Sequence, residues 1–178
     1  LRARQQQRLA GFGERVQWLD RLPDTFTGCV LANEVLDAMP VKLLQRETDG
    51  SLSELAVTRA EDGFAWAARA LDRDLQDLAD SRLPAIAGYR SEINLRAEAW
   101  VRQMGEWLAR GAALLIDYGF PRREYYHPQR TEGTLMCHFR HHAHDQPLIL
   151  PGLQDITAHV DFTAMADAAL DGGLDVLG

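Results

Sequence analysis

Two short, wholly apolar runs restrict the possible folds of this chain more than any other feature. Residues 29–32 (CVLA) and 112–116 (AALLI) are continuous apolar runs next to turn residues, the pattern of strands that are buried on both faces of a parallel sheet. Helical patterns at 1–10, 91–110 and 162–171 alternate with them. This alternation predicts an α/β fold built on a doubly wound, parallel sheet.

The stretch between the two apolar runs has a different period. Its segments 41–47, 53–60 and 63–71 are each separated by turn residues, which predicts an antiparallel β meander inserted into the parallel sheet. It could equally be an arm that packs on a partner. We expect one partial domain over 1–178, with this meander at 41–71 and a helical segment at 72–110.

Several shorter elements are also predicted. Residues 15–19 alternate like a strand, residues 134–139 suggest another, and residues 174–177 a last one. Asp161 is expected to cap the helix at 162–171. The first residue is Leu1 and the chain opens in a helical pattern, so we expect it to be a fragment of a longer protein.

Composition narrows the classes of partner. The chain has 178 residues, 46% hydrophobic and 25% charged, with a net charge of -7. An acidic balance argues against a nucleic acid and suits a cationic partner. Cys29 and Cys137 lie far apart in apolar runs, which favours reduced thiols in a cytosolic protein. No apolar run is long enough for a membrane span.

Polar residues follow both apolar runs directly. Ligands in open α/β sheets bind beyond the carboxyl ends of the strands, which selects residues 33–40 and the triplet 117–119 (DYG). If 33–39 forms one helical turn, Glu34 and Asp37 share a face. They could then bind a cofactor hydroxyl, a cation or a guanidinium. The alternative is that Asn33 caps the turn and both carboxylates are solvated.

A histidine-rich segment at 137–145 suggests a metal site, but its spacing does not match that of zinc ligands on a helix. We therefore expect no metal. His144 or His159 would serve as a hydrogen-bonding group or general base, and the alternative is that the segment is a simple polar loop. Asp155 and His159 are candidates for an acceptor pocket. No glycine-rich turn of the GxGxxG type is present, so the residues alone do not name a cofactor.

Three blocks together resemble the MidA-like methyltransferase family: 31–41 (LANEVLDAMPV), 114–119 (LLIDYG) and 133–162. The opening LRARQQQRL is also similar to a helix of that family. The resemblance implies a Rossmann-like, class I fold with a β-rich insertion and the cofactor S-adenosylmethionine. It also implies that the glycine-rich first loop lies upstream of Leu1. Mitochondrial members of the family assist respiratory complex I assembly by methylating an arginine of one subunit.

The resemblance also implies roles for individual residues. Trp18, Leu19 and Asp20 would end the third strand, near the adenine. Asn33 and Glu34 would end the fourth, beside the methionine and sulfonium, and Asp117 and Tyr118 would end the fifth. The acceptor would lie near Asp155, Asp161 and Glu92, although Glu92 could instead be an acid at a helix N-terminus.

The expected reaction is methyl transfer to a protein arginine. Glu34 and Asp37 would hold the guanidinium by charged hydrogen bonds, with His144 or His159 as proton acceptor. Two alternatives stay open: a catalytically weak assembly chaperone or binding module on the same fold, and a methyltransferase for small molecules. The expected location is the cytoplasm of a bacterium or the mitochondrial matrix of a eukaryote.

Overall fold

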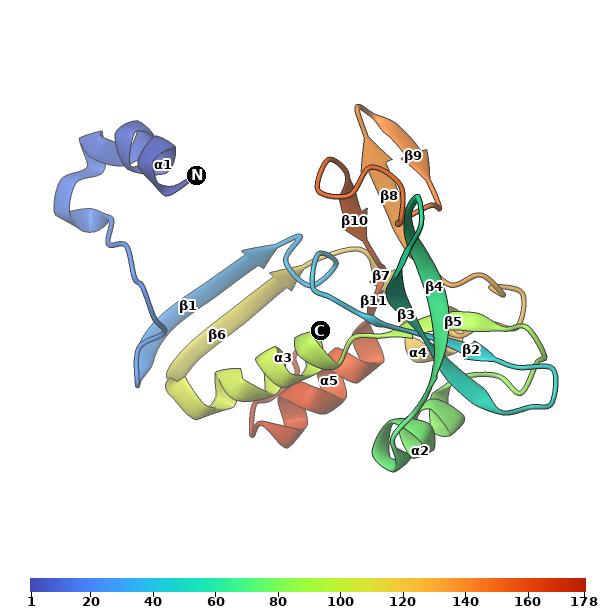
Figure 1. Cartoon of the computed structure of the whole chain (residues 1–178). Coiled ribbons are helices and arrows are strands. Elements are labelled where there is room, and N and C mark those ends of the chain that lie inside the picture. Colours follow the sequence, from blue (N-terminus) through green and yellow to red (C-terminus); the bar gives the residue numbers. More distant parts are fainter.

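The computed structural model describes residues 1–178, which form a parallel strand pair, an antiparallel sheet and two small outer sheets (Figure 1). The elements are α1 (Arg2–Leu9), the 3₁₀ helix η1 (Ala10–Arg15), β1 (Phe26–Asn33), β2 (Lys42–Arg46), β3 (Leu52–Ala60), β4 (Gly63–Ala70), α2 (Arg73–Arg82), β5 (Arg90–Ile93), α3 (Leu95–Trp107), β6 (Leu108–Ile116), β7 (Gly119–Phe120), α4 (Arg122–Tyr125), β8 (Met136–Phe139), β9 (His142–His144), β10 (Asp155–Thr157), β11 (Val160–Asp161) and α5 (Phe162–Asp171).

Strands β1 and β6 form the parallel pair and contain the two apolar runs. They stay in register up to Asn33 and Ile116, so both carboxyl ends lie at one edge. Helices α3 and α5 pack together below the pair in Figure 1. One buried cluster joins these helices to the loop after β1; its members are Leu36, Ala97, Val101, Val160, Ala164, Met165 and Ala168, and Leu115 of β6 packs against it.

The predicted burial of both strands on two faces is wrong for these 178 residues. Leu31, Leu114 and Ile116 are 69%, 58% and 45% exposed. The helices cover only the face to which Leu115 points, and neighbouring residues of a strand point to opposite faces. The parallel pair therefore presents an uncovered apolar face.

Helices α3 and α5 touch through two glycines. A β-carbon added at Gly105 would lie 1.7 Å from the carbonyl oxygen of Gly172, and one added at Gly172 would lie 2.4 Å from the carbonyl oxygen of Arg102. No side chain larger than hydrogen fits at either position while the backbones stay in place. This contact sets the separation between the end of α3 and the end of α5.

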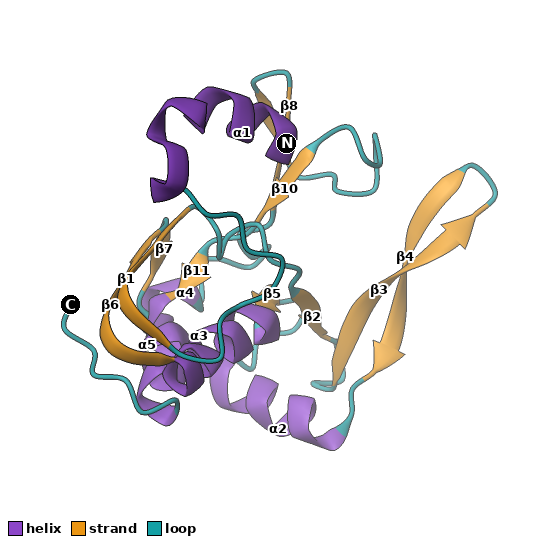
Figure 2. Ribbon diagram, turned by 90° about the vertical axis from the view of Figure 1, so that its left-hand side faces the viewer, coloured by secondary structure: helices purple, strands orange, loops and turns teal.

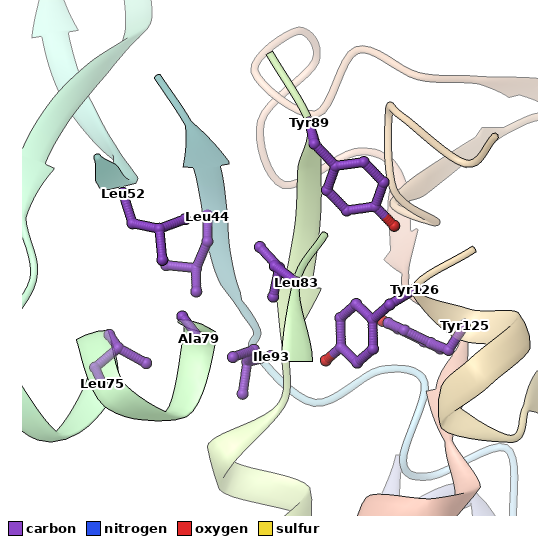
Figure 3. Packing of buried hydrophobic residues seen from close by; sticks show 9 residues of the cluster. All are labelled: Leu44, Leu52, Leu75, Ala79, Leu83, Tyr89, Ile93, Tyr125 and Tyr126. Carbon is purple, nitrogen blue, oxygen red and sulfur yellow. The ribbon is translucent and has the colours of Figure 1, made fainter. Parts of the chain in front are cut away.

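The antiparallel sheet has the order β4-β3-β2-β5 and is backed by α2. Strands β2, β3 and β4 lie where the sequence predicts them, and β3 and β4 form a long hairpin that projects from the body (Figure 2). The core beneath the sheet contains four leucines, Ala79, Ile93 and three tyrosines (Figure 3). Nothing in the sequence pattern signalled the fourth strand, β5.

Three local predictions need correction. The helix predicted at 91–110 runs only from Leu95 to Trp107, because residues 90–93 pair with β2 and residues 108–110 belong to β6. Asn94 caps that helix by accepting from the Ala97 N–H. The segments 15–19 and 174–177 are not strands, since neither has a neighbouring strand within the chain to supply ladder hydrogen bonds.

The outer sheets frame the carboxyl edge of the parallel pair. The pair β11 and β7 is parallel, and β10-β8-β9 is antiparallel and stands above it in Figure 1. Asp161 caps α5 as predicted, its carboxylate accepting from the Ala164 N–H at 3.1 Å. No helix has the length and apolar character to cross a membrane.

Candidate active site at the ends of β1 and β6

The two strand ends are tied together by direct hydrogen bonds. The Glu34 N–H donates to the Ile116 carbonyl at 2.8 Å. The Asp117 carboxylate accepts from the N–H groups of Leu36 and Asp37 at 3.0 and 3.2 Å. The predicted common edge is therefore present, and Asp117 holds the loop after β1. We call Asn33, Glu34, Asp37, Asp117 and Tyr118 the rim.

The loop after β1 is not the helical turn considered from the sequence. Asn33 is the last residue of β1, and Glu34 has a left-handed φ of 50°. This conformation ends the strand abruptly and drives Leu36 into the core, where it is 1% exposed. As a result the two carboxylates do not share a helix face: Glu34 is exposed, whereas Asp37 is buried.

Asp37 is the most constrained acid of the rim. It is 5% exposed, and its Oδ2 accepts a hydrogen bond of 2.5 Å from the Tyr118 hydroxyl. Its Oδ1 is buried without any partner. Burial, together with the bond to Asp37, raises the pKa of Tyr118 to about 12. Tyr118 is thus a hydrogen-bond donor at neutral pH, and one Asp37 oxygen has unused capacity to bind a donor.

His159 lies next to this pair. Its ring stacks on Phe120 and meets Tyr118 edge-on, with centroid distances of 5.2 Å in both cases. Burial lowers the pKa of His159, so the imidazole is neutral at pH 7. Its Nδ1 is buried with no partner. The Ala158 N–H donates to the Asp37 carbonyl at 3.0 Å, which places the histidine segment against the rim.

Glu92 does not reach the surface. It lies on β5 rather than at a helix N-terminus, and its side chain is fully buried. Burial raises the pKa of this carboxyl, while donors from residues 134 and 135 and from Tyr125 surround it. Both oxygens of the Glu92 carboxylate therefore accept hydrogen bonds within the fold.

The other predicted acids and His144 do not join the rim. Asp161 caps α5 and pairs with Arg122 at 3.3 Å. Asp155 is exposed on β10. The Nδ1 of His144 on β9 accepts from the Gln146 N–H at 3.3 Å. None of the three has a hydrogen bond to a rim residue.

The predicted adenine-side residues lie in the segment between η1 and β1. No strand forms there; Leu19 is 66% exposed, and Asp20 forms an ion pair with Arg2. In Figure 1 the blue N-terminal part, with α1, lies apart from the sheets. The structure therefore does not bring Trp18, Leu19 or Asp20 together with the rim.

Two contributors to this region were missed from the sequence. Asn94 donates to the Leu36 carbonyl at 3.1 Å and so supports the loop after β1; its position one residue before a helix was an available capping signal. Thr134 accepts from the His159 N–H at 3.0 Å, and no sequence signal points to it.

The rim suits a positively charged ligand. Glu34 has an exposed carboxylate, and Asp37 has a buried oxygen without a partner. These groups fit the sulfonium and ammonium charges of S-adenosylmethionine, or a guanidinium. No group of three or more His, Cys, Asp or Glu side chains is arranged to hold a metal ion.

Comparison with known proteins identifies relatives of this chain. A family model described as "putative S-adenosyl-L-methionine-dependent methyltransferase" matches residues 1–178. The mitochondrial protein arginine methyltransferase NDUFAF7 homologue of Drosophila melanogaster is 34% identical over 159 residues, covering 84% of this chain and 34% of that protein. NDUFAF7 of Danio rerio is 31% identical over 169 residues, covering 89% of this chain and 37% of that protein.

A solved structure is similar over the entire chain. It is a "likely methyl transferase" from Burkholderia thailandensis bound to S-adenosyl-homocysteine, 48% identical, with a TM-score of 0.93. The alignment covers 100% of this chain and 47% of that one. The chain thus spans about a third of the curated relatives and about half of this solved one. By sequence and fold, these 178 residues belong to the family of S-adenosylmethionine-dependent methyltransferases.

Proposed function

We propose that the protein containing these residues transfers a methyl group from S-adenosylmethionine to an arginine of a protein partner. The observation that carries the proposal is the rim itself. An exposed carboxylate, Glu34, and a buried one with a free oxygen, Asp37, follow the same strand end. The net charge of -7 also favours a cationic partner.

An arginine acceptor is a planar cation that stays protonated at neutral pH. Carboxylates can hold its nitrogens by charged hydrogen bonds and orient one of them. We assign this task to Glu34 and to the free Oδ1 of Asp37. Alignment of the reacting groups is the main requirement of such a transfer, and good orientation can contribute about 7–11 kcal/mol to the barrier reduction.

The cofactor supplies an electrophilic methyl group on its sulfonium. We assign its binding to Asn33, Glu34 and Tyr118, with Asp117 holding the loop that presents them. His159 is assigned as the proton acceptor, because burial keeps its imidazole neutral and its Nδ1 has no partner. His144 and Asp155 could contact the protein partner from the outer sheet.

The relatives support the arginine specificity by name. Curated proteins of Drosophila melanogaster and Danio rerio are named mitochondrial protein arginine methyltransferases. If the protein comes from a eukaryote, as these relatives do, we expect it to work in the mitochondrial matrix. If it comes from a bacterium, we expect it to work in the cytoplasm. A role in complex I assembly would follow only if its partner is a subunit of that complex.

Mass spectrometry of a deletion strain tests the proposal most directly. We expect one or more methylarginines to disappear from the cell's proteins and to return when the complete protein is restored. An unchanged methylarginine inventory would refute the arginine acceptor. Titration calorimetry with S-adenosylmethionine separates an enzyme from a binding module that has lost its cofactor.

Glu34→Gln in the complete protein tests the role of the exposed carboxylate. We expect turnover to fall about 100-fold and S-adenosylmethionine affinity to fall by a smaller factor, because Asn33 and Tyr118 still bind the cofactor. Glu61→Gln is the matched control, because Glu61 is an exposed glutamate in the turn of the β3–β4 hairpin. Normal turnover in Glu34→Gln would remove Glu34 from the mechanism.

A further inference from the structure

Glu92 is surrounded by hydrogen-bond donors. The Thr134 N–H donates to both carboxylate oxygens at 3.1 and 3.0 Å, and the Leu135 N–H donates to Oε1 at 3.1 Å. The hydroxyls of Thr134 and Tyr125 donate to Oε2 at 3.1 and 3.3 Å. A carboxylate buried among so many donors organises the segments that supply them.

The loop opposite Glu92 is shaped around the carboxylate. Gly133 has a φ of +75°, and a β-carbon there would lie 2.3 Å from Oε1 of Glu92. Only glycine suits both the conformation and the space. The loop 133–135 is therefore held tightly against one buried carboxylate.

Thr134 connects this carboxylate to His159. Its Oγ donates to Glu92 Oε2 at 3.1 Å and accepts from the backbone N–H of His159 at 3.0 Å. Glu92 and His159 also line one small cavity of about 10 Å³. The chain of contacts runs from a strand of the antiparallel sheet to the histidine that packs on Tyr118 beside Asp37.

Glu92 is anchored from the opposite side as well. The Tyr126 hydroxyl donates to the Glu92 carbonyl at 3.0 Å, and Tyr125 and Tyr126 lie side by side at one end of the buried cluster (Figure 3). The two residues that Thr134 connects are therefore both held in place. Glu92 is held by the core, and the His159 ring is held by Tyr118 and Phe120.

We propose that Glu92 is a positioning residue that sets His159 against the rim through the Thr134 hydroxyl. In this role Glu92 acts through Thr134 rather than by contact with the cofactor or the acceptor. Its effect on methyl transfer rests on the function proposed above, whereas its effect on the placement of His159 does not. The two parts are tested by different measurements on the same variants.

The placement is tested by NMR on the complete protein. Thr134→Val removes the hydroxyl but keeps the branched shape, and Thr134→Ser keeps the hydroxyl. Glu92→Gln puts an NH₂ donor among groups that all donate to Glu92, so the Thr134 hydroxyl must turn and its bond to His159 weakens. We expect amide exchange at His159 to rise about tenfold in Thr134→Val and Glu92→Gln, with shifted His159 ring resonances, and Thr134→Ser to stay near wild type.

Steady-state kinetics test the functional part. We expect Glu92→Gln and Thr134→Val each to lower kcat about tenfold, to leave KM for S-adenosylmethionine within about twofold, and to be no worse together than singly. Glu54→Gln is the matched control. Glu54 is a buried carboxylate on β3, paired with Lys42 and Arg69, and has no link to His159, so its variant should keep wild-type kcat and His159 signals.

The outcomes separate the two proposals. Unchanged His159 signals in both Glu92→Gln and Thr134→Val would overturn the positioning role, and so would additive losses of kcat in the double variant. Should Glu92→Gln fail to fold, the Thr134 pair decides alone: equal His159 signals in Thr134→Val and Thr134→Ser overturn the link. If the wild-type protein methylates nothing while His159 moves as expected, the proposed function fails and the positioning role stands.

Discussion

Glu92 and Asp37 are both buried acids close to the His159 segment, yet their surroundings are opposite. Both oxygens of the Glu92 carboxylate accept hydrogen bonds from the protein itself. Asp37 receives one hydroxyl at Oδ2 and leaves Oδ1 unpaired. An unpaired buried oxygen is costly, so the Glu92 carboxylate is fully used within the fold, whereas Asp37 Oδ1 fits the ligand-binding role proposed for it above.

The largest expected difference is in stability. Glu92→Ala would leave the buried N–H of Thr134 and the partly buried N–H of Leu135 without their acceptor. We expect the free energy of unfolding to fall by about 3–5 kcal/mol. Asp37→Ala removes one acceptor from a half-exposed tyrosine and should cost about 1 kcal/mol. Urea unfolding of both variants measures the two losses of unfolding free energy. Similar losses would contradict the different roles assigned to Glu92 and Asp37.

The next largest effect is on turnover, where we expect substitution of Asp37 to matter more than substitution of Glu92. Asp37→Asn keeps an oxygen for Tyr118 but removes the charge that would face a cation, so we expect kcat to fall about 100-fold, or about 2.7 kcal/mol. The free energy of unfolding should change by less than about 1 kcal/mol. Single-turnover methyl transfer checks this, and an active Asp37→Asn enzyme would contradict the ligand role.

A smaller contrast lies in the pH dependence of stability. Burial raises the pKa of Glu92 above its ordinary value of 4.5, so its contribution is full below about pH 4.5 and is lost as pH rises through the folded-state pKa. Glu54 is opposite: burial opposes its ionisation, but Lys42 and Arg69 outweigh burial and hold its pKa below 4.5. Its contribution is lost as pH falls through that lowered pKa.

These signs can be checked with two variants. From pH 4.5 upward the wild-type protein should lose stability relative to Glu92→Gln, because the amide cannot ionise. Below pH 4.5 it should lose stability relative to Glu54→Gln. Thermal unfolding across a pH series measures both differences, and equal slopes in the three proteins would contradict the two assigned directions.

The smallest expected effect concerns the hydroxyl that joins Tyr118 to Asp37. Tyr118→Phe removes the donor at Oδ2 and should cost about 0.5–1.5 kcal/mol of unfolding free energy. Packing of the ring on His159 should persist. A loss comparable with that of Glu92→Ala would show that Asp37, too, is mainly structural.

The sequence predicted that the two strands end at a common edge, but it did not predict the contacts of Asn94 and Thr134 that support this edge. Apolar runs followed by Asn33 and Asp117 were enough to predict where the strands end, because strand burial and turn residues are local signals. The different exposure of Glu34 and Asp37 was not predictable from their spacing. The spacing suggested a helical turn, but the left-handed φ of Glu34 prevents one.

Long-range contacts explain the remaining misses. Glu92 and Thr134 are 42 residues apart in the chain, and no periodicity records such a pairing. Residues 90–93 became a strand because β2 offered a partner, so tertiary pairing outweighed the helical pattern that begins nearby. The strands predicted at 15–19 and 174–177 do not form, for the converse reason: neither segment has a partner strand within the chain.

The glycine contact between α3 and α5 has a consequence for how this protein can vary. Helix α5 begins at Phe162, three residues after His159, so the axis of α5 and the placement of the imidazole are mechanically coupled. A methyl group at Gly105 would push against the Gly172 carbonyl and displace the helix as a unit, because a packed interior yields little. We therefore expect substitutions at the far end of α5 to shift the His159 imidazole near its other end, without any direct contact with that ring.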